Sequence, residues 1–342
     1  MAILKSSQFS PSFATPPRIL VTGATGFVGS HLAERLAELG CELYLLLRQT
    51  SKLDHIAHLR FTPVISDLRN PAVLAEAVGK VDYIFHSAGL VKAQSLDEFM
   101  LINAGGTQSL LELALKHNPN LKRFVLVSSQ AAGGPSTGNA LRREDDPAAP
   151  VSDYGRSKRA AEEAVLAVKN QLPVTIVRPP AVFGPRDTEV LTFFKFVRCG
   201  LMLKFGGKES FVSIVYVADL VDGILRAGML PEGVGEIFHI NTQDELSQWQ
   251  AQRLMAQVMK TDIQPLRIPL WLLRKLAPRM EKLDRKLGNS PLLSADKVRE
   301  LSCPKWTTSS ERARQRLGFV PLQSLEESLG ETYDWYREHK WV

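Results

Sequence analysis

Two residues suited to proton transfer, Tyr154 and Lys158, stand four positions apart in the run YGRSK. The residues after them have the apolar spacing of a helix, and a spacing of four puts both side chains on the same helix face. A phenol with a pKa of about 10 exchanges protons slowly at neutral pH, and a neighbouring ammonium group lowers that pKa. The pair therefore suggests general acid–base chemistry, and the alternative is two solvated residues on a helix surface.

Two hydroxyl groups, Ser128 and Ser129, follow the apolar run Arg123–Val127, which we interpret as a buried strand. A hydroxyl at the end of that strand can hydrogen-bond a substrate carbonyl, whereas a plain turn residue is the alternative. In an open parallel sheet, the carboxyl ends of neighbouring strands meet in one crevice. We therefore expect the serines to lie close to Tyr154.

A glycine-rich turn, TGATGFVG at residues 22–29, separates the apolar run Arg18–Thr22 from a stretch of helical length that ends near Gly40. A first glycine permits a tight turn, a second lets backbone N–H groups approach a pyrophosphate, and a third lets the helix pack closely on the strand. The flanking strand and helix make a dinucleotide site a better interpretation than an ordinary glycine-rich turn. The predicted contacts are Thr22, Gly23, Thr25, Gly26, Phe27, Val28 and Gly29.

The end of the second predicted strand, residues 43–47, indicates which dinucleotide binds. Folds that bind NAD place a carboxylate there, about twenty residues after the glycines, against the ribose 2′-hydroxyl. Arg48 takes that place in this chain, and a guanidinium suits the 2′-phosphate of NADP. We therefore predict NADP, with NAD or a merely solvated Arg48 as the alternatives. Lys52 is expected to assist, and Asp67 is expected to accept from the adenine amino group or to cap a helix.

The elements that must hold these residues alternate between β-branched apolar runs and amphipathic runs of helical length over residues 18–180. This order is typical of βαβ units and predicts a Rossmann fold of the α/β class, with a doubly wound parallel sheet. After Pro180 the alternation weakens, so we expect a smaller, mostly helical C-terminal substrate lobe, with loop and helix over 181–207. We assign 1–17 to a disordered leader, 18–180 with 211–228 and 236–247 to the dinucleotide-binding domain, and 181–210 with 248–342 to the substrate lobe.

Composition narrows the class of partner. The 342 residues carry a net charge of +6 from 42 basic and 36 acidic side chains, which are interspersed, so no nucleic-acid partner is expected. No apolar run reaches the roughly 20 residues of a membrane span, and no secretory signal is visible, so we expect a cytoplasmic protein. The three cysteines lie far apart without a CxxC pair, so no metal is predicted.

Two segments of the expected substrate lobe carry unusual side chains. Residues 266–280 are basic and amphipathic, which suits a membrane surface, but we favour a lid over the substrate pocket and do not expect membrane contact. The other segment is expected to form a mostly apolar rim, with ordinary helix packing as the alternative, from Phe183, Arg186, Phe193, Phe194 and Phe196.

Six motifs together resemble those of the extended short-chain dehydrogenase/reductase superfamily, also called the NAD-dependent epimerase/dehydratase family. They are TGATGFVG, the pair Asp67-Leu68, HSAG at 86–89, SSQ at 128–130, YGRSK and RPPAVFGP at 178–185. The resemblance covers nearly the whole chain from Arg18 onward. It is strongest toward dihydroflavonol reductases and 3β-hydroxysteroid dehydrogenase-like proteins.

The resemblance implies a Ser-Tyr-Lys mechanism, in which Tyr154 exchanges the proton at the substrate oxygen while Lys158 lowers its pKa and holds the nicotinamide ribose. It implies Ser129 as the catalytic hydroxyl, with Ser128 as the fallback, and it places Asn103 beside a proton-relay water. Some sugar-nucleotide epimerases of the superfamily use the third position of this motif, where this chain has Gln130. The other cofactor contacts that it implies are Leu68, His86, Ser87, Ala88, Gly89, Ser128, Pro179, Ala181 and Val182.

Three functions are compatible with this resemblance. The preferred one is an NADP-dependent oxidoreductase that interconverts a hydroxyl and a ketone on a small, hydrophobic substrate. The second is a nucleotide-sugar epimerase or dehydratase that retains NAD(P) and binds a diphosphate through Arg186 and Arg198, although typical sugar epimerases carry Asp where Leu47 stands. The third is a non-enzymatic NADP sensor, which the intact Ser-Tyr-Lys set argues against. Relatives commonly pair through the helices at 103–117 and 154–169, so we expect a homodimer.

Overall fold

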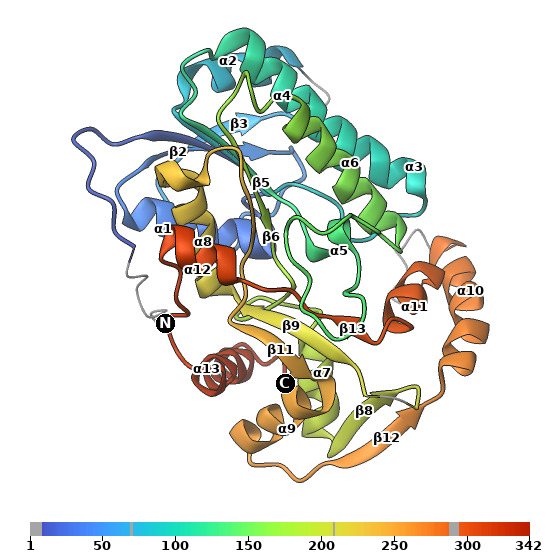
Figure 1. Ribbon diagram of the computed structural model, residues 1–342. Helices are drawn as coiled ribbons and strands as arrows, with labels where there is room; N and C mark the ends of the chain where they lie inside the picture. The colour runs from blue at the N-terminus through green and yellow to red at the C-terminus, as the bar shows by residue number, and fades with distance from the viewer. Residues whose placement is uncertain (1–8, 69–70, 208, 287–293) are drawn as a thin grey trace.

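The computed structural model describes residues 9–68, 71–207, 209–286 and 294–342. In this part of the chain the central sheet has seven parallel strands, in the order β10-β6-β5-β4-β1-β2-β3 (Figure 1). Its strands are β1 (Arg18–Thr22), β2 (Glu42–Leu47), β3 (Thr62–Ile65), β4 (Tyr83–His86), β5 (Arg123–Val127), β6 (Val174–Arg178) and β10 (Ile237–His239). The strand order runs in opposite directions on the two sides of β1, so the predicted Rossmann fold is confirmed.

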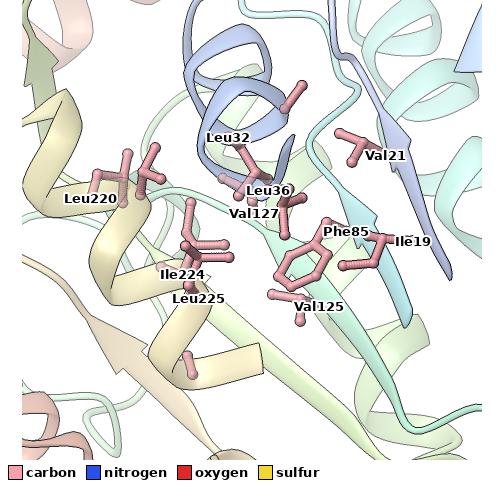
Figure 2. Close-up of a cluster of buried hydrophobic side chains, with 14 of the residues drawn as sticks. Ile19, Val21, Leu32, Leu36, Phe85, Val125, Val127, Leu220, Ile224 and Leu225 are labelled. Carbon is pink, nitrogen blue, oxygen red and sulfur yellow. The ribbon is translucent and has the colours of Figure 1, made fainter. Parts of the chain in front are cut away.

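Helices cover both faces of this sheet (Figure 1). On one face lie α1 (Phe27–Glu38) and α8 (Val217–Met229), and on the other α2 (Pro71–Lys80), α4 (Gly106–His117) and α6 (Asp153–Ala167). Strands buried on both faces have continuous apolar sequences rather than alternating ones, so their positions can be predicted from the sequence. Figure 2 shows the α1 and α8 layer, where Leu32, Leu36, Leu220, Ile224 and Leu225 meet Ile19, Val21, Phe85, Val125 and Val127.

Two smaller sheets lie outside the central one. In the first, β9 (Phe211–Tyr216) pairs with β7 (Ala181–Phe183), β11 (Gln243–Ser247) and β13 (Lys305–Trp306), and in the second β8 (Leu201–Phe205) pairs with β12 (Gln264–Ile268). The remaining helices are α3 (Leu96–Phe99), a π-helix (Met100–Gly105), α5 (Gln130–Gly133), α7 (Leu191–Arg198), a 3-10 turn (Pro231–Gly233), α9 (Gln248–Met259), α10 (Leu270–Lys286), α11 (Ala295–Leu301), α12 (Glu311–Leu317) and α13 (Leu325–Glu338).

Strand pairing divides two segments that were assigned to the dinucleotide-binding domain. Within 211–228 and 236–247, α8 and β10 pack on or join the central sheet, whereas β9 and β11 pair with each other in the smaller sheet, although Val215 of β9 reaches the same core as α8. Conversely, α12 was assigned to the substrate lobe but packs on α8. The strands β7, β8, β12 and β13 were not predicted, because they are short and partly exposed, which hides their apolar pattern.

The predicted disordered leader, residues 1–17, is also corrected over its second half. Residues 1–8 lie outside the described residues, whereas Phe9 and Phe13 pack against the α1 and α8 layer. Arg35 donates to the Phe9 carbonyl at 3.2 Å, and the Arg226 guanidinium lies 5.2 Å from the centre of the Phe9 ring. Two aromatic rings give this short segment the apolar contact that a disordered leader lacks.

A buried ion pair joins α6 to the ends of two strands. Glu162 on α6 accepts two hydrogen bonds from Arg178 of β6, at 2.8 and 2.7 Å, and one from Ser128 after β5, at 2.6 Å. All three side chains are buried. A carboxylate in such a place is stable only while its partners remain, so this pair fixes α6 at the carboxyl edge of the sheet.

We predict that Glu162→Leu lowers the free energy of unfolding by about 3–5 kcal/mol, because the Arg178 charge would be left buried and uncompensated. Urea denaturation checks the loss. The double variant Glu162→Leu with Arg178→Met should recover most of it. Glu163→Gln is the control, since Glu163 makes an exposed ion pair with Arg159 at 2.9 Å that is worth about 1 kcal/mol at most. Equal losses in the two single variants would contradict the prediction.

Candidate active site

The carboxyl ends of four adjacent strands bring most of the predicted site residues to one edge of the sheet. β1 leads into the glycine turn, β4 into Ser87, β5 into Ser129 and β6 into Pro179, and these strands are neighbours in the order β6-β5-β4-β1. Their loops are joined by backbone hydrogen bonds, from Ser87 N–H to Thr22 at 3.2 Å and from Gln130 N–H to Pro179 at 2.9 Å. The strand order changes direction between β1 and β4, which is where ligands bind in sheets of this kind.

The glycine turn has the geometry that a pyrophosphate needs. Gly23 has a φ of +74°, and a Cβ there would lie 2.7 Å from the Ala88 nitrogen, so only glycine fits against the β4 loop. A Cβ on Gly29 would overlap the Gly23 carbonyl. Gly26 is the N-cap of α1, and no side chain caps that helix, so its first N–H groups remain available to an anion. Thr25, Phe27 and Val28 are half-buried beside the turn.

The residues predicted to read the adenosine end lie at the edge beyond β1. Arg48 is exposed directly after β2, and its loop is closed by hydrogen bonds with Ser51 of 3.0 and 2.9 Å. Lys52 is exposed in the same loop. Asp67 is half-buried after β3, and Leu68 packs so closely on α4 that a Cβ on Gly106 would lie 2.7 Å from it. Arg48 and Lys52 thus present two exposed cations in the loop after β2.

The candidate catalytic side chains meet where α6 begins. Tyr154 lies in the first turn of α6, with the Ser129 side chain near enough to its hydroxyl to lower the pKa. Lys158 is one turn further on and donates to the Val127 carbonyl at 2.8 Å. The Phe99 ring packs 5.9 Å from the tyrosine ring and holds it in place. The structure therefore brings the predicted serine, tyrosine and lysine together.

Burial sets the ionisation of this cluster. It raises the pKa of Tyr154, and the Glu300 and Glu189 carboxylates raise it further, while the Ser129 side chain lowers it. Burial also lowers the pKa of Lys158 to about 8, with Glu162 opposing that change. The sequence predicted that Lys158 lowers the pKa of Tyr154. The Lys158 ammonium instead faces the Val127 carbonyl, and Ser129 is the group that lowers the pKa of Tyr154.

The two serines have different partners. Ser128 is buried and donates to Glu162, as described above, whereas Ser129 caps α5 by accepting from the Ala131 N–H at 3.1 Å and also contacts Tyr154. Ser129 is half-exposed. The geometry thus favours Ser129 over Ser128 as the catalytic hydroxyl. Ser128 is instead a positioning residue, because it binds Glu162.

Asn103 and His86 support the site from within the protein. Asn103 lies on the π-helix and is buried, accepting from the Leu90 N–H at 2.7 Å and donating to the Leu90 carbonyl at 3.0 Å and to Ser157 on α6 at 2.9 Å. A side chain at Gly89 would lie 3.1 Å from the Asn103 oxygen and 3.6 Å from the Lys158 nitrogen. A π-bulge often marks a functional site, and here it joins the loop after β4 to α6.

The ring of His86 does not line a pocket. Its nitrogens lie 2.7 Å from the Thr22 hydroxyl and 3.0 Å from the Thr107 hydroxyl, and the side chain is buried. Burial, helped by the Lys158 charge, lowers its pKa to about 3, so the ring is neutral. The predicted contact with the ribose region therefore falls to its exposed neighbour Gly89 and to the half-buried Ser87 and Ala88.

Sequence reasoning missed a contact between the C-terminal lobe and α6. The Asp296 carboxylate of α11 accepts from the Asp153 N–H at 2.8 Å and from the Tyr154 N–H at 3.4 Å. A negative charge at a helix N-terminus is favourable. Asp296 and Asp153 are 143 residues apart, so no local pattern could have revealed the pair.

A hollow of about 480 Å³ lies beside this contact. Its walls are mostly apolar and consist of Val151, Arg274, Ala277, Ala295, Val298, Arg299 and Ser302. Val151 is three residues before Tyr154, so one wall belongs to the segment that leads into α6. The hollow was not predicted, because its walls come from α10, α11 and the segment before α6.

The predicted aromatic rim is largely packing. Phe183 and Phe194 are buried in the core between β7, α7 and α13, whereas Phe193 and Phe196 are half-buried. Arg186 forms an ion pair with Glu34 of α1 at 2.7 Å and donates to Ser30 at 3.0 Å. Ala181 is exposed and Val182 half-buried at the start of β7, next to Pro179. The alternative of ordinary packing therefore holds for Phe183 and Phe194.

Residues 19–240 match the NAD dependent epimerase/dehydratase family. The chain belongs to this family. It is thus a member of the extended short-chain dehydrogenase/reductase superfamily, as the motifs indicated, and its relatives are NAD(P)-dependent oxidoreductases and epimerases.

Individual relatives span different substrates. The chain is 30% identical to the ceramide reductase of Caulobacter vibrioides over 325 residues, 95% of this chain and 96% of that protein. It is 27% identical to the 3-beta-hydroxysteroid dehydrogenase of Mycolicibacterium neoaurum over 345 residues, 94% and 92% of the two chains. The crystal structure of UDP-glucose 4-epimerase from Thermotoga maritima has a TM-score of 0.77 at 24% identity, covering 94% and 99%, and shares the fold.

We predict that burial of Lys158 makes the stability of the apoprotein rise with pH. The folded-state pKa of about 8 lies below the ordinary 10.5, so the buried ammonium destabilises the fold below pH 8, and that cost fades as pH rises from 8 to 10.5. At neutral pH, Lys158→Met should therefore be more stable than the parent by up to about 3 kcal/mol. Urea unfolding at about pH 7 and 9.5 measures whether this advantage shrinks.

The control for this experiment is Lys169→Met, because Lys169 is exposed just beyond α6. It should show no pH-dependent difference from the parent. An advantage of Lys158→Met that stays constant between the two pH values would contradict the assignment of the shift to this lysine.

Proposed function

We propose that this chain is an NADP-dependent oxidoreductase that interconverts a hydroxyl and a ketone on a small, hydrophobic substrate. The observation that carries the proposal is the placement of Tyr154 beside Ser129, one turn from Lys158 and at the strand edge that also holds the glycine turn. Such an arrangement supports proton exchange at an oxygen atom that lies next to a bound dinucleotide.

In the direction of reduction, the protonated Tyr154 donates its proton to the carbonyl oxygen, and Ser129 donates a hydrogen bond to the same oxygen. The nicotinamide, when bound, supplies the hydride and accepts it in the reverse direction. Lys158 is mostly protonated at neutral pH, since its pKa is about 8, and its ammonium donates to the Val127 carbonyl at 2.8 Å. Asn103 holds α6 and the loop after β4 together through its hydrogen bonds to Ser157 and Leu90.

The choice of NADP rests on Arg48 and Lys52. Both are exposed in the loop after β2, the loop that contacts the adenosine ribose in dinucleotide-binding folds, and residues 45–48, Leu-Leu-Leu-Arg, provide no carboxylate for a 2′-hydroxyl. A guanidinium forms charge-assisted hydrogen bonds to phosphate oxygens. The glycine turn is consistent with either dinucleotide, so the loop alone decides the preference.

The hydrophobic substrate rests on the hollow beside α6 and on the relatives. Its walls are mostly apolar, and it lies beside the segment that carries Tyr154. The relatives described above include reductases or dehydrogenases named for a ceramide and a steroid, both of which are largely apolar molecules. We propose that the hollow takes the apolar part of the substrate.

A nucleotide-sugar epimerase has less support from the site. That function would need free cations for a diphosphate, and Arg186, one of the two arginines available for it, is held by Glu34 and Ser30. Purified protein that carries bound nicotinamide and turns over a sugar nucleotide would favour the epimerase over the reductase.

We predict that Tyr154→Phe lowers kcat with NADPH and an apolar ketone by about 10²–10⁴-fold, because the proton donor is lost. Ser129→Ala should lower kcat by about 10²-fold through the lost hydrogen bond to the substrate oxygen. Stopped-flow measurement of NADPH oxidation with a panel of ketones checks both. Unchanged turnover in Tyr154→Phe would remove the enzymatic proposal.

Ser128→Ala is the matched control for the serine. It should keep kcat within a few-fold but lower the free energy of unfolding by about 1.5–3 kcal/mol, because Glu162 loses a donor. The opposite pattern, with kcat lost in Ser128→Ala and kept in Ser129→Ala, would reassign the catalytic hydroxyl.

We predict that Arg48→Ala raises the Kd for NADPH by about 10–100-fold and the Kd for NADH by less than about threefold, because only the former carries the 2′-phosphate. Fluorescence titration of the reduced cofactors measures both constants. The control Arg253→Ala removes an exposed arginine on α9 and should change neither. Equal changes for both cofactors in Arg48→Ala would overturn the NADP preference.

A further inference from the structure

The helix α10 is anchored on one face only. Leu273 and Ala277 are buried and pack with Val298 of α11 in a small core. The Glu281 carboxylate accepts from the Ala295 N–H at 3.2 Å, on the same side. In Figure 1 α10 lies at the edge of the molecule, with α11 between it and the central sheet.

The opposite face of α10 presents one aromatic ring and several cations to solvent. Trp271 is 65% exposed, and Lys275, Pro278 and Lys282 follow it at spacings of four, three and four, which places them on the same face. Arg279 is exposed beside them. A tryptophan with two thirds of its surface in water contributes little to the stability of the fold.

Apolar side chains are also exposed outside this face. Leu276 and Met280 on α10 are 37% and 40% exposed, but their positions in the helix place them nearer to the buried Leu273 than to Trp271. We refer to the exposed side chains on the Trp271 side of the helix as the α10 surface: Trp271, Lys275, Arg279 and Lys282. It combines one aromatic ring with three cations.

The charge balance of this segment is one-sided. Residues 264–282 contain five cations and a single acid, Glu281, whose carboxylate is turned to α11. The whole chain, by contrast, has 42 basic and 36 acidic residues. The α10 surface is therefore a local basic patch with an exposed tryptophan among the charges.

We propose that the α10 surface docks the protein on an anionic lipid bilayer. Tryptophan suits the boundary between headgroups and acyl chains, and each lysine or arginine near an anionic surface adds about 1 kcal/mol. No helix in the described residues is long and apolar enough to cross a membrane, so the contact is one of a helix lying on the surface. This docking goes beyond the proposed function.

The same helix also lines the hollow, since Arg274 and Ala277 belong to both α10 and the hollow wall. The buried Ala277 and the exposed Trp271 lie on different sides of the helix, so one helix can cover the hollow and contact a membrane. If the proposed function holds, an apolar ketone dissolved in the bilayer would have only the thickness of α10 to pass before it reaches the hollow.

Co-sedimentation with lipid vesicles tests the docking without any reference to activity. Wild-type protein should bind vesicles of phosphatidylcholine with about 30% phosphatidylglycerol, bind pure phosphatidylcholine at least tenfold more weakly, and be released by about 0.5 M salt. Lys275→Glu with Arg279→Glu should weaken binding to the anionic vesicles at least tenfold. Trp271→Ser alone should weaken it by about tenfold and is the second variant, should the first fail to fold.

The matched control, Lys116→Glu with Arg253→Glu, makes the same change of charge at exposed positions of α4 and α9 and should bind the vesicles as the wild type does. Failure of the wild type to bind anionic vesicles, or an equal loss in this control, would overturn the proposal. Equal affinity for double-stranded DNA at the same salt would assign the surface to polyanions in general and overturn it too. Turnover of a water-soluble ketone by each variant without vesicles tells a docking failure from a failure of the proposed function.

Discussion

The position of each candidate catalytic group depends on how α6 is held against the end of β5. Three consecutive residues of that strand end bind three helix residues spaced by four: Val127 with Lys158, Ser128 with Glu162, and Ser129 with Tyr154. Because a helix presents every fourth residue on one face, a single line of contacts sets the serine, tyrosine and lysine together. The buried Arg178 makes this possible, since its guanidinium compensates the Glu162 carboxylate at the end of this row of helix residues.

The burial that fixes α6 also decides which protons the resting site holds. Removal from water raises the pKa of the phenol and lowers that of the ammonium, so both groups are shifted toward their neutral forms. A protonated phenol is the form from which a carbonyl oxygen can be protonated. The Glu189 and Glu300 carboxylates raise the pKa of Tyr154 further and so favour its protonated form. Both residues lie outside the central sheet, so the outer segments also affect the ionisation of the phenol.

Much of the central sheet could be predicted from the sequence, because strands covered on both faces keep long apolar runs between recognisable turns. The glycine turn and the Tyr-Lys spacing are local patterns too, and they fixed the location of the site. What could not be predicted depends on distant partners: Glu162 with Arg178, Asp296 with the start of α6, and Arg186 with Glu34. The strand β12 could not be predicted, because it contains Pro265 and its residues are exposed on both of its faces.

The two hydrogen bonds that Asp296 accepts from the first turn of α6 make α11 a joint between the hollow and the phenol. Ala295 and Val298, on either side of that carboxylate in the sequence, line the hollow. The wall of the hollow and the anchor of the first turn of α6 therefore belong to the same short helix, so a substitution that shifts α11 changes both together.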